Sequence, residues 1–120
     1  MKNSKSDNPE LLNLIRFLKK ASRESNVKIW RSIAHTLSKT RSNRVSVNLS
    51  RINRHTEKRQ VVVVPGKVLG AGTLRHPVTI AAFAYSATAK AKIKEAKGRY
   101  LTLPELVKKY PKGSNVKVLG

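Results

Sequence analysis

The residues whose types and spacing best suit a chemical role are basic, and the densest group lies between residues 39 and 59. Seven Lys and Arg residues stand there against a single acid, Glu57. Arginine presents a planar fork of donors that binds a phosphate through two hydrogen bonds. Residues 39–44 have no apolar periodicity and predict an exposed loop that can follow an irregular anionic surface. The residues of this group expected to contact the phosphates of a polyanion are Lys39, Arg41, Arg44, Arg51 and Arg54.

A second basic group is expected on one face of a helix. Lys90, Lys94 and Lys97 follow one another at positions i, i+4 and i+7, and only Glu95 opposes them. Like charges at this spacing destabilise a helix by roughly 0.2–0.5 kcal/mol per pair. A face that is merely solvated usually mixes both signs of charge. The pattern therefore favours contact between these lysines and nucleic-acid phosphates.

Candidate catalytic groups are sparse. Asp7 and Glu10 are the only close carboxylates, and both fall at a predicted helix start, where negative charge is stabilising. The histidines His35, His55 and His76 lack the spacing of metal ligands. His55 lies in the basic group and is expected to bind RNA by contacting a phosphate or stacking on a base, although a plain surface role is also open. A pair of histidines acting as general acid and base on RNA is a further alternative.

Two short glycine motifs do not form nucleotide-binding loops. Gly70-Ala71-Gly72 begins like a dinucleotide fingerprint, but Arg75 stands where the third glycine is required. Gly66-Lys67 lacks the remaining residues of a phosphate-binding loop. These glycines instead indicate turns with positive φ or a close backbone approach, either to RNA phosphate or to protein.

Phe83 and Tyr85 are two residues apart in a predicted strand and are expected on one face of it. If exposed, they would form a platform on which bases stack. Their apolar neighbours favour burial instead.

The composition calls for an anionic partner. The 120 residues include 26 Lys and Arg against 6 Asp and Glu, giving a formal net charge of +20. A compact body with this charge repels itself, and nucleic acid is the commonest polyanion. Hydrophobic residues make up 39% of the chain, which fits one folded domain rather than a disordered basic tail. Zero Cys excludes disulfides, thiolate zinc sites and a cysteine nucleophile.

The first third of the chain predicts a helical hairpin. Residues 1–6 are a frayed, polar start, and Asn8 with Pro9 is typical of a helix N-terminus. Apolar residues at helical spacing predict one helix over 9–24 and a second from a cap at Ser25 or Asn26 to about Ser38. We therefore expect a hairpin over residues 7–38. Neither a secretory signal nor an apolar run long enough to span a bilayer is expected.

Residues 39–60 are expected to hold the basic loop, a short strand at 45–47 and a short helix capped by Asn48. Residues 61–120 are expected to form the α/β body. In it, Val61–Val64 predicts a strand buried on both faces and closed by a Pro65-Gly66 turn. The remaining predicted elements are a strand at 78–85, a helix at 87–97 capped by Ser86 and ended by Gly98, a strand at 100–101, a helix capped by Thr102 and a strand at 116–119. This order favours a single layered α/β domain over residues 1–120.

Several segments of the chain resemble one family. VNLSRINR (47–54), VVVPGKVLGAG (62–72), FAYSATAKAKI (83–93) and GSNVKVLG (113–120) are similar to the eighteen-e family of large-subunit ribosomal proteins of archaea and eukaryotes, a sister of bacterial ribosomal protein fifteen. The resemblance implies an irregular superhelix of strand-strand-helix turns and a structural, non-catalytic role. By position it implies RNA contacts at Arg41, Arg44, Asn48, Arg51, Arg54, Lys67, Gly70, Gly72 and Arg75.

The expected function is that of a structural constituent of the large ribosomal subunit that binds ribosomal RNA through Arg and Lys contacts to phosphate. The expected partners are large-subunit ribosomal RNA and neighbouring ribosomal proteins, in the cytoplasm, with no cofactor, metal, membrane or small-molecule substrate. The alternative is a basic nucleic-acid-binding protein that acts outside the ribosome. A ribonuclease that uses two histidines is the third hypothesis.

Overall fold

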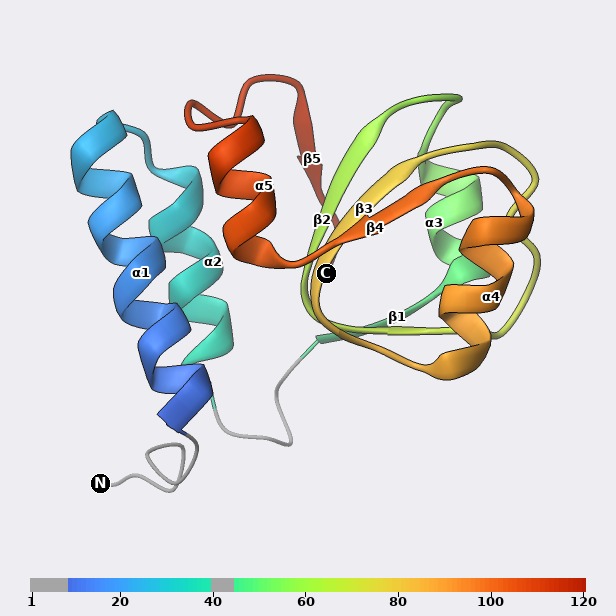
Figure 1. Ribbon diagram of the computed structural model, residues 1–120, viewed down its shortest axis with the longest axis horizontal. Helices are drawn as coiled ribbons and strands as arrows, with labels where there is room; N and C mark the ends of the chain where they lie inside the picture. The colour runs from blue at the N-terminus through green and yellow to red at the C-terminus, as the bar shows by residue number, and fades with distance from the viewer. Residues whose placement is uncertain (1–8, 40–44) are drawn as a thin grey trace.

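A computed structural model describes residues 9–39 and 45–120, and in these ranges five helices surround one parallel sheet (Figure 1). The helices are α1 (Pro9–Ser25), α2 (Ile29–Leu37), α3 (Leu49–His55), α4 (Ala87–Glu95) and α5 (Leu103–Lys109). The strands are β1 (Val45–Asn48), β2 (Val61–Leu69), β3 (Thr79–Tyr85), β4 (Arg99–Leu101) and β5 (Val116–Val118). The predicted α/β domain with an N-terminal helical hairpin is confirmed. The predicted frayed start, Asp7 and the Asn8 cap lie outside the described residues.

Strand β2 is the centre of the sheet. It pairs in parallel with β3 along one edge, and β3 pairs in parallel with β4. Two short strands share its other edge, since β5 pairs with residues 61–63 and β1 pairs with residues 66–69. All strands therefore run in the same direction, and we call the edge of the sheet where β2, β3, β4 and β5 begin the amino edge.

Pro65 and Gly66 do not end the strand as predicted, because β2 continues through them to Leu69. The pairing with β3 shifts register between Val64 and Lys67, so the missing N–H of the proline falls where the ladder is already interrupted. Glycine is required at the next position, where a Cβ would lie 2.0 Å from the carbonyl oxygen of Val45 in β1. The dipeptide thus forms a bulge in a central strand rather than a turn.

Alternate residues of the central strands pack into two separate apolar clusters. Val63 and Ala81 pack with α1, α2 and α5 on one face of the sheet. Val62, Val64 and Ile80 pack with α3 and α4 on the other face. This two-residue alternation follows from the pleat of a strand. The prediction that residues 61–64 are buried on both faces is confirmed, and Figure 1 shows the two helical layers on either side of the sheet.

The single tryptophan of the helical hairpin forms a hydrogen bond to the α/β body. Trp30 is fully buried, and its Nε1 donates to the carbonyl oxygen of Pro111 at 2.8 Å. Helix α2 starts at Ile29, later than the predicted cap at Ser25 or Asn26. The reason is that Asn26 takes a left-handed conformation with φ of +54°, so residues 26–28 form the turn of the hairpin.

The two aromatic residues of β3 do not share a face, contrary to the prediction. Phe83 packs against the α1–α2–α5 cluster, whereas Tyr85 packs against the α3–α4 cluster. Tyr85 is the last residue of β3 and lies just beyond the bulge in β2, where the regular alternation ends. Its hydroxyl donates to the carbonyl oxygen of Leu101 at 2.6 Å, and burial raises the pKa of Tyr85 above its ordinary value. The burial that the sequence favoured is therefore confirmed, because both rings are at least partly buried.

Candidate nucleic-acid interface

Helix α3 presents its basic residues because its apolar residues face inward. Leu49 and Ile52 are fully buried in the α3–α4 cluster. Arg54 and His55 in the last turn of this short helix are exposed. Both residues are therefore accessible to a ligand, as the predicted role requires.

Two other predicted contacts of this segment, Arg51 and Asn48, differ in their structural roles. Arg51 is half-buried, and its Nη2 donates to the carbonyl oxygen of Gly120 at 3.4 Å. Asn48 occupies the N-cap position of α3 but makes no capping hydrogen bond with its side chain. That side chain is exposed at the end of β1, and its contact with RNA stays a prediction.

The loop after β2 is held against α3 and α4 by close backbone contacts. The Lys92 ammonium donates to the carbonyl oxygens of Gly70 at 2.7 Å and Gly72 at 2.8 Å. A Cβ on Gly70 would lie 2.7 Å from the side chain of Thr88, and one on Gly72, where φ is +88°, would lie 2.4 Å from the Cβ of Ser50. Of the two alternatives for these glycines, the structure shows the close approach to protein. Their contact with RNA stays a prediction.

The same loop brings Arg75 to α3. The backbone N–H of Arg75 donates to Oδ1 of Asn53 at 2.9 Å, which joins residues 22 apart in the chain. Arg75 is exposed and Asn53 immediately precedes Arg54, so this hydrogen bond places two separately predicted basic segments next to each other in the fold. We call this set the α3–loop surface. It consists of Arg51, Arg54, His55 and Arg75.

Two of the three predicted lysines of α4 share a face. The Nζ atoms of Lys90 and Lys94 lie 5.9 and 5.8 Å from the centroid of the Tyr100 ring, a cation–π geometry. Lys97 does not join them, because α4 ends at Glu95 and Lys97 lies in the turn before β4. The prediction of one face with three lysines is therefore wrong for Lys97.

The end of α4 explains this difference. The N–H of Gly98 donates to the carbonyl of Ile93, and the N–H of Lys97 donates to that of Lys94, both at 2.9 Å. This pair of bonds is a Schellman motif, whose left-handed residue is Lys97 (φ +64°) and not Gly98, the residue predicted to end the helix. Glycine is required one position later, where a Cβ would lie 2.6 Å from the carbonyl oxygen of Val78.

The remaining predicted residues lie apart from the α3–loop surface in the chain. Lys39 follows α2 and is exposed. Lys67 is exposed on β2, paired with Ser46 of β1 and Ala84 of β3. Arg41 and Arg44 lie outside the described residues.

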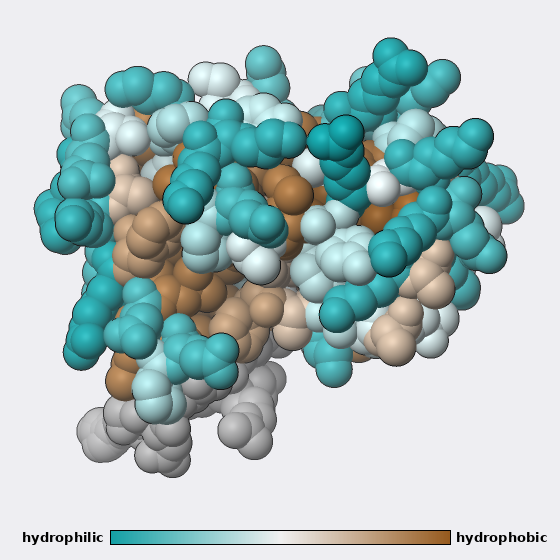
Figure 2. Space-filling model, viewed as in Figure 1, coloured by the Kyte–Doolittle hydropathy of each residue, from teal (hydrophilic) through white to brown (hydrophobic). Residues whose placement is uncertain are grey.

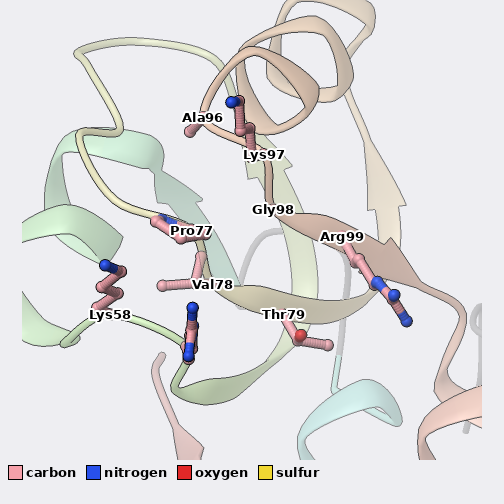
Figure 3. Close-up of a pocket in the computed structure, with 9 residues that line it drawn as sticks. Lys58, Pro77, Val78, Thr79, Ala96, Lys97, Gly98 and Arg99 are labelled. Carbon is pink, nitrogen blue, oxygen red and sulfur yellow. The ribbon is translucent and has the colours of Figure 1, made fainter.

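Sequence reasoning named Lys97 but missed the group of cations in which it lies, at the amino edge of the sheet. A cleft of about 590 Å³ opens there between the start of β2 and the end of α4 (Figure 3). An adjoining cleft of about 480 Å³ lies between the starts of β2 and β5. The cations that line them are Lys58, Arg59, Lys97, Arg99 and Lys117. The basic character of residues 39–59 pointed to the first two, but only the parallel topology brings them to residues 97–99 and 117.

Two groups that could do acid–base chemistry, His76 and Glu105, form structural hydrogen bonds. The Thr56 hydroxyl donates to the carbonyl of Ile52 at 2.6 Å, so Nε2 of His76, 3.0 Å away, must donate to that hydroxyl. Hydrogen bonds to the backbone and side chain of Thr102 in the capping box of α5 hold the pKa of Glu105 below its ordinary value. Within the described ranges, no three His, Asp or Glu side chains are grouped to hold a metal ion.

Hydrophilic side chains project around the rim of the molecule, on both the hairpin side and the α3–α4 side (Figure 2). Across residues 9–39 and 45–120, no helix combines the length and the apolar character that a bilayer crossing requires.

Comparison with known proteins gives consistent matches along the whole chain. The family model described as ribosomal protein 60S L18 and 50S L18e matches residues 1–120. The chain is 50% identical over 112 residues to the large ribosomal subunit protein eL18 of Methanoregula boonei, covering 93% of each chain. It is 47% identical over 118 residues to the protein of the same name from Methanospirillum hungatei, covering 98% of this chain and 97% of the relative. The corresponding protein of Methanothermobacter thermautotrophicus is 44% identical over 112 residues.

Proposed function

The chain belongs to the family of ribosomal proteins 60S L18 and 50S L18e, and we propose that it binds large-subunit ribosomal RNA through Arg and Lys contacts to phosphate. Its role is that of a structural protein of the large ribosomal subunit rather than an enzyme, as the resemblance implied. Within the cytoplasmic ribosome its neighbours are ribosomal RNA and other ribosomal proteins.

The observation that carries the RNA proposal is the α3–loop surface. Arg54, His55 and Arg75 are exposed on backbone that is itself tied down, because Asn53 holds the loop to α3 and Lys92 holds its glycine carbonyls. A surface that is already ordered loses little conformational entropy when it binds. Arginine in such a setting can form two hydrogen bonds to one phosphate. The surface therefore supports contacts that fix the protein in one orientation on RNA.

The test removes charge from this surface without touching the core. Arg54→Gln with Arg75→Gln should weaken binding to transcribed large-subunit ribosomal RNA and lower the slope of log K against log salt by about 2, one per lost phosphate contact. Lys108→Gln with Lys109→Gln removes the same charge from the exposed end of α5 and is the matched control. Equal salt slopes for the two double variants would place the RNA contacts elsewhere.

A separate measurement distinguishes the ribosomal role from that of a nucleic-acid-binding protein acting outside the ribosome. The tagged full chain, expressed in its own cells, should sediment with large subunits in a sucrose gradient. It should stay with them at salt concentrations that remove weakly bound basic proteins. Recovery only in the light fractions would favour the alternative.

A further inference from the structure

The cleft between the start of β2 and the end of α4 is a concentration of positive charge that the proposed interface does not include. Its lining has four cations, Lys58, Arg59, Lys97 and Arg99, and no acid. Its volume of about 590 Å³ is typical of pockets that enclose a ligand, which span roughly 300–1,000 Å³. Cations gathered in a concave site repel one another unless an anion enters.

Two of these cations have a backbone conformation that residues other than glycine rarely adopt. Four non-glycine residues of the described ranges have positive φ, and two of them are asparagines, which tolerate this conformation. The other two are Arg59 (φ +66°) and Lys97 (φ +64°), and both line this cleft. Glycine would relieve the strain at either position, so a long basic side chain at both points to a use for the charge.

The floor of the cleft is built from backbone. The N–H of Arg59 donates to the carbonyl of Pro77 at 2.6 Å, and the N–H of Arg99 donates to that of Val78 at 2.9 Å. Gly98 lies so close to Val78 that no side chain fits between them. In Figure 3 the labelled side chains of Lys58, Lys97 and Arg99 surround this floor. The cations are therefore positioned by hydrogen-bonded backbone from three segments of the chain.

We propose that this cleft receives the sugar-phosphate backbone of RNA as a site additional to the α3–loop surface. The proposal rests on the proposed function for the identity of the RNA. In this proposal a phosphate enters the cleft between the two left-handed residues, and Arg59 and Lys97 contact it from two separate segments of the chain. Lys58 and Arg99 at the same cleft would contact the flanking phosphates.

The test pairs a charge variant with a backbone variant. Arg59→Gln with Lys97→Gln should lower affinity for transcribed large-subunit ribosomal RNA roughly tenfold and reduce the loss of affinity between 50 and 200 mM salt by a similar factor. Arg59→Gly with Lys97→Gly should weaken RNA binding equally while leaving the melting temperature the same or higher. Lys108→Gln with Lys109→Gln is again the charge-matched control. RNA binding by both cleft variants at the control's level would overturn the proposal.

A second readout uses the free protein and inorganic phosphate. In NMR spectra, the amide signals of residues 59 and 97–99 should shift together on titration with phosphate, and the Arg59→Gln with Lys97→Gln variant should not respond. Absence of these shifts in the wild type would overturn the site even if RNA binds elsewhere. If phosphate shifts the amide signals of the wild type but the cleft variants bind RNA as tightly as the wild type, the cleft binds free phosphate and the RNA proposal is overturned. Failure of the wild type to bind ribosomal RNA would instead refute the proposed function.

Discussion

Replacing Lys92 by methionine should destabilise the protein, although in a chain of charge +20 the loss of a positive charge is expected to be favourable. The Lys92 ammonium is the donor that holds the carbonyl oxygens of Gly70 and Gly72, at 2.7 and 2.8 Å. Methionine keeps the unbranched apolar stem but cannot donate. The variant therefore removes two hydrogen bonds and leaves the packing of the stem in place.

The magnitude follows from the exposure of the groups involved. A hydrogen bond to a charged group contributes about 1.5–3 kcal/mol when its partners are shielded from water. Lys92 is half-buried, and the Gly72 carbonyl belongs to an exposed residue that water can reach. We therefore discount each bond below this range, to about 1 kcal/mol, which gives a loss of about 2 kcal/mol for the two bonds together. For a domain of this size that corresponds to a fall in Tm of roughly 8 °C.

The assay is urea denaturation followed by the fluorescence of Trp30, the only tryptophan in the chain. Lys20→Met is the matched control, because Lys20 is exposed in the middle of α1 and its loss should change the free energy of unfolding by less than about 0.5 kcal/mol. A Lys92→Met protein as stable as the Lys20→Met control would refute the view that the ammonium holds the loop.

Two further substitutions test the loop and the last helix. Gly72→Ala should lower the free energy of unfolding by at least about 2 kcal/mol, because φ is +88° and the new Cβ would collide with Ser50. Ser50→Gly should therefore destabilise the Gly72→Ala protein less than it destabilises the wild type. Independent effects in that double-mutant cycle would contradict the contact. Because the pKa of Glu105 is lower in the folded protein than the ordinary carboxyl pKa of 4.5, its carboxylate stabilises the fold at pH values above 4.5. This stabilisation is lost as the pH falls through the lower pKa of the folded protein. Glu105→Gln keeps the cap but cannot titrate, so its Tm should fall less than that of the wild type below pH 4.5, and parallel Tm–pH curves would count against this.

The elements whose signal is local could be predicted from the sequence. The Thr102 cap of α5 and the Ser86 cap of α4 form as expected, because a cap depends on residues a few positions apart in the chain. The bulge at Pro65-Gly66 could not be predicted, since a turn and a bulge use the same residues and differ only in what pairs beside them. The left-handed position of Lys97 depends on contact of Gly98 with β3, which is distant in sequence.

The candidate interface divides in the same way. Arg54 and His55 could be found by charge density, and their exposure follows from the buried face of α3. That Arg75 lies beside α3 could not be predicted from the sequence, because this placement depends on a hydrogen bond between the Arg75 backbone and Asn53, 22 residues away in the chain. Whether an individual cation faces a carbonyl, as Lys92 does, or remains free for phosphate is decided by tertiary contacts that composition does not record.

The parallel sheet also decides where α3 and α4 end. Each runs back against the strands, so the carboxyl ends of both helices arrive at the amino edge, among the cations. A helix carboxyl end carries about half a negative charge, which stabilises a nearby cation by roughly 0.3–1 kcal/mol. Lys117 already donates to the last carbonyl of α3, that of His55, at 2.5 Å, and Lys97 stands just beyond α4. The protein thus supplies its basic edge with an internal counter-charge, which lowers the repulsion among these cations when no anion is bound.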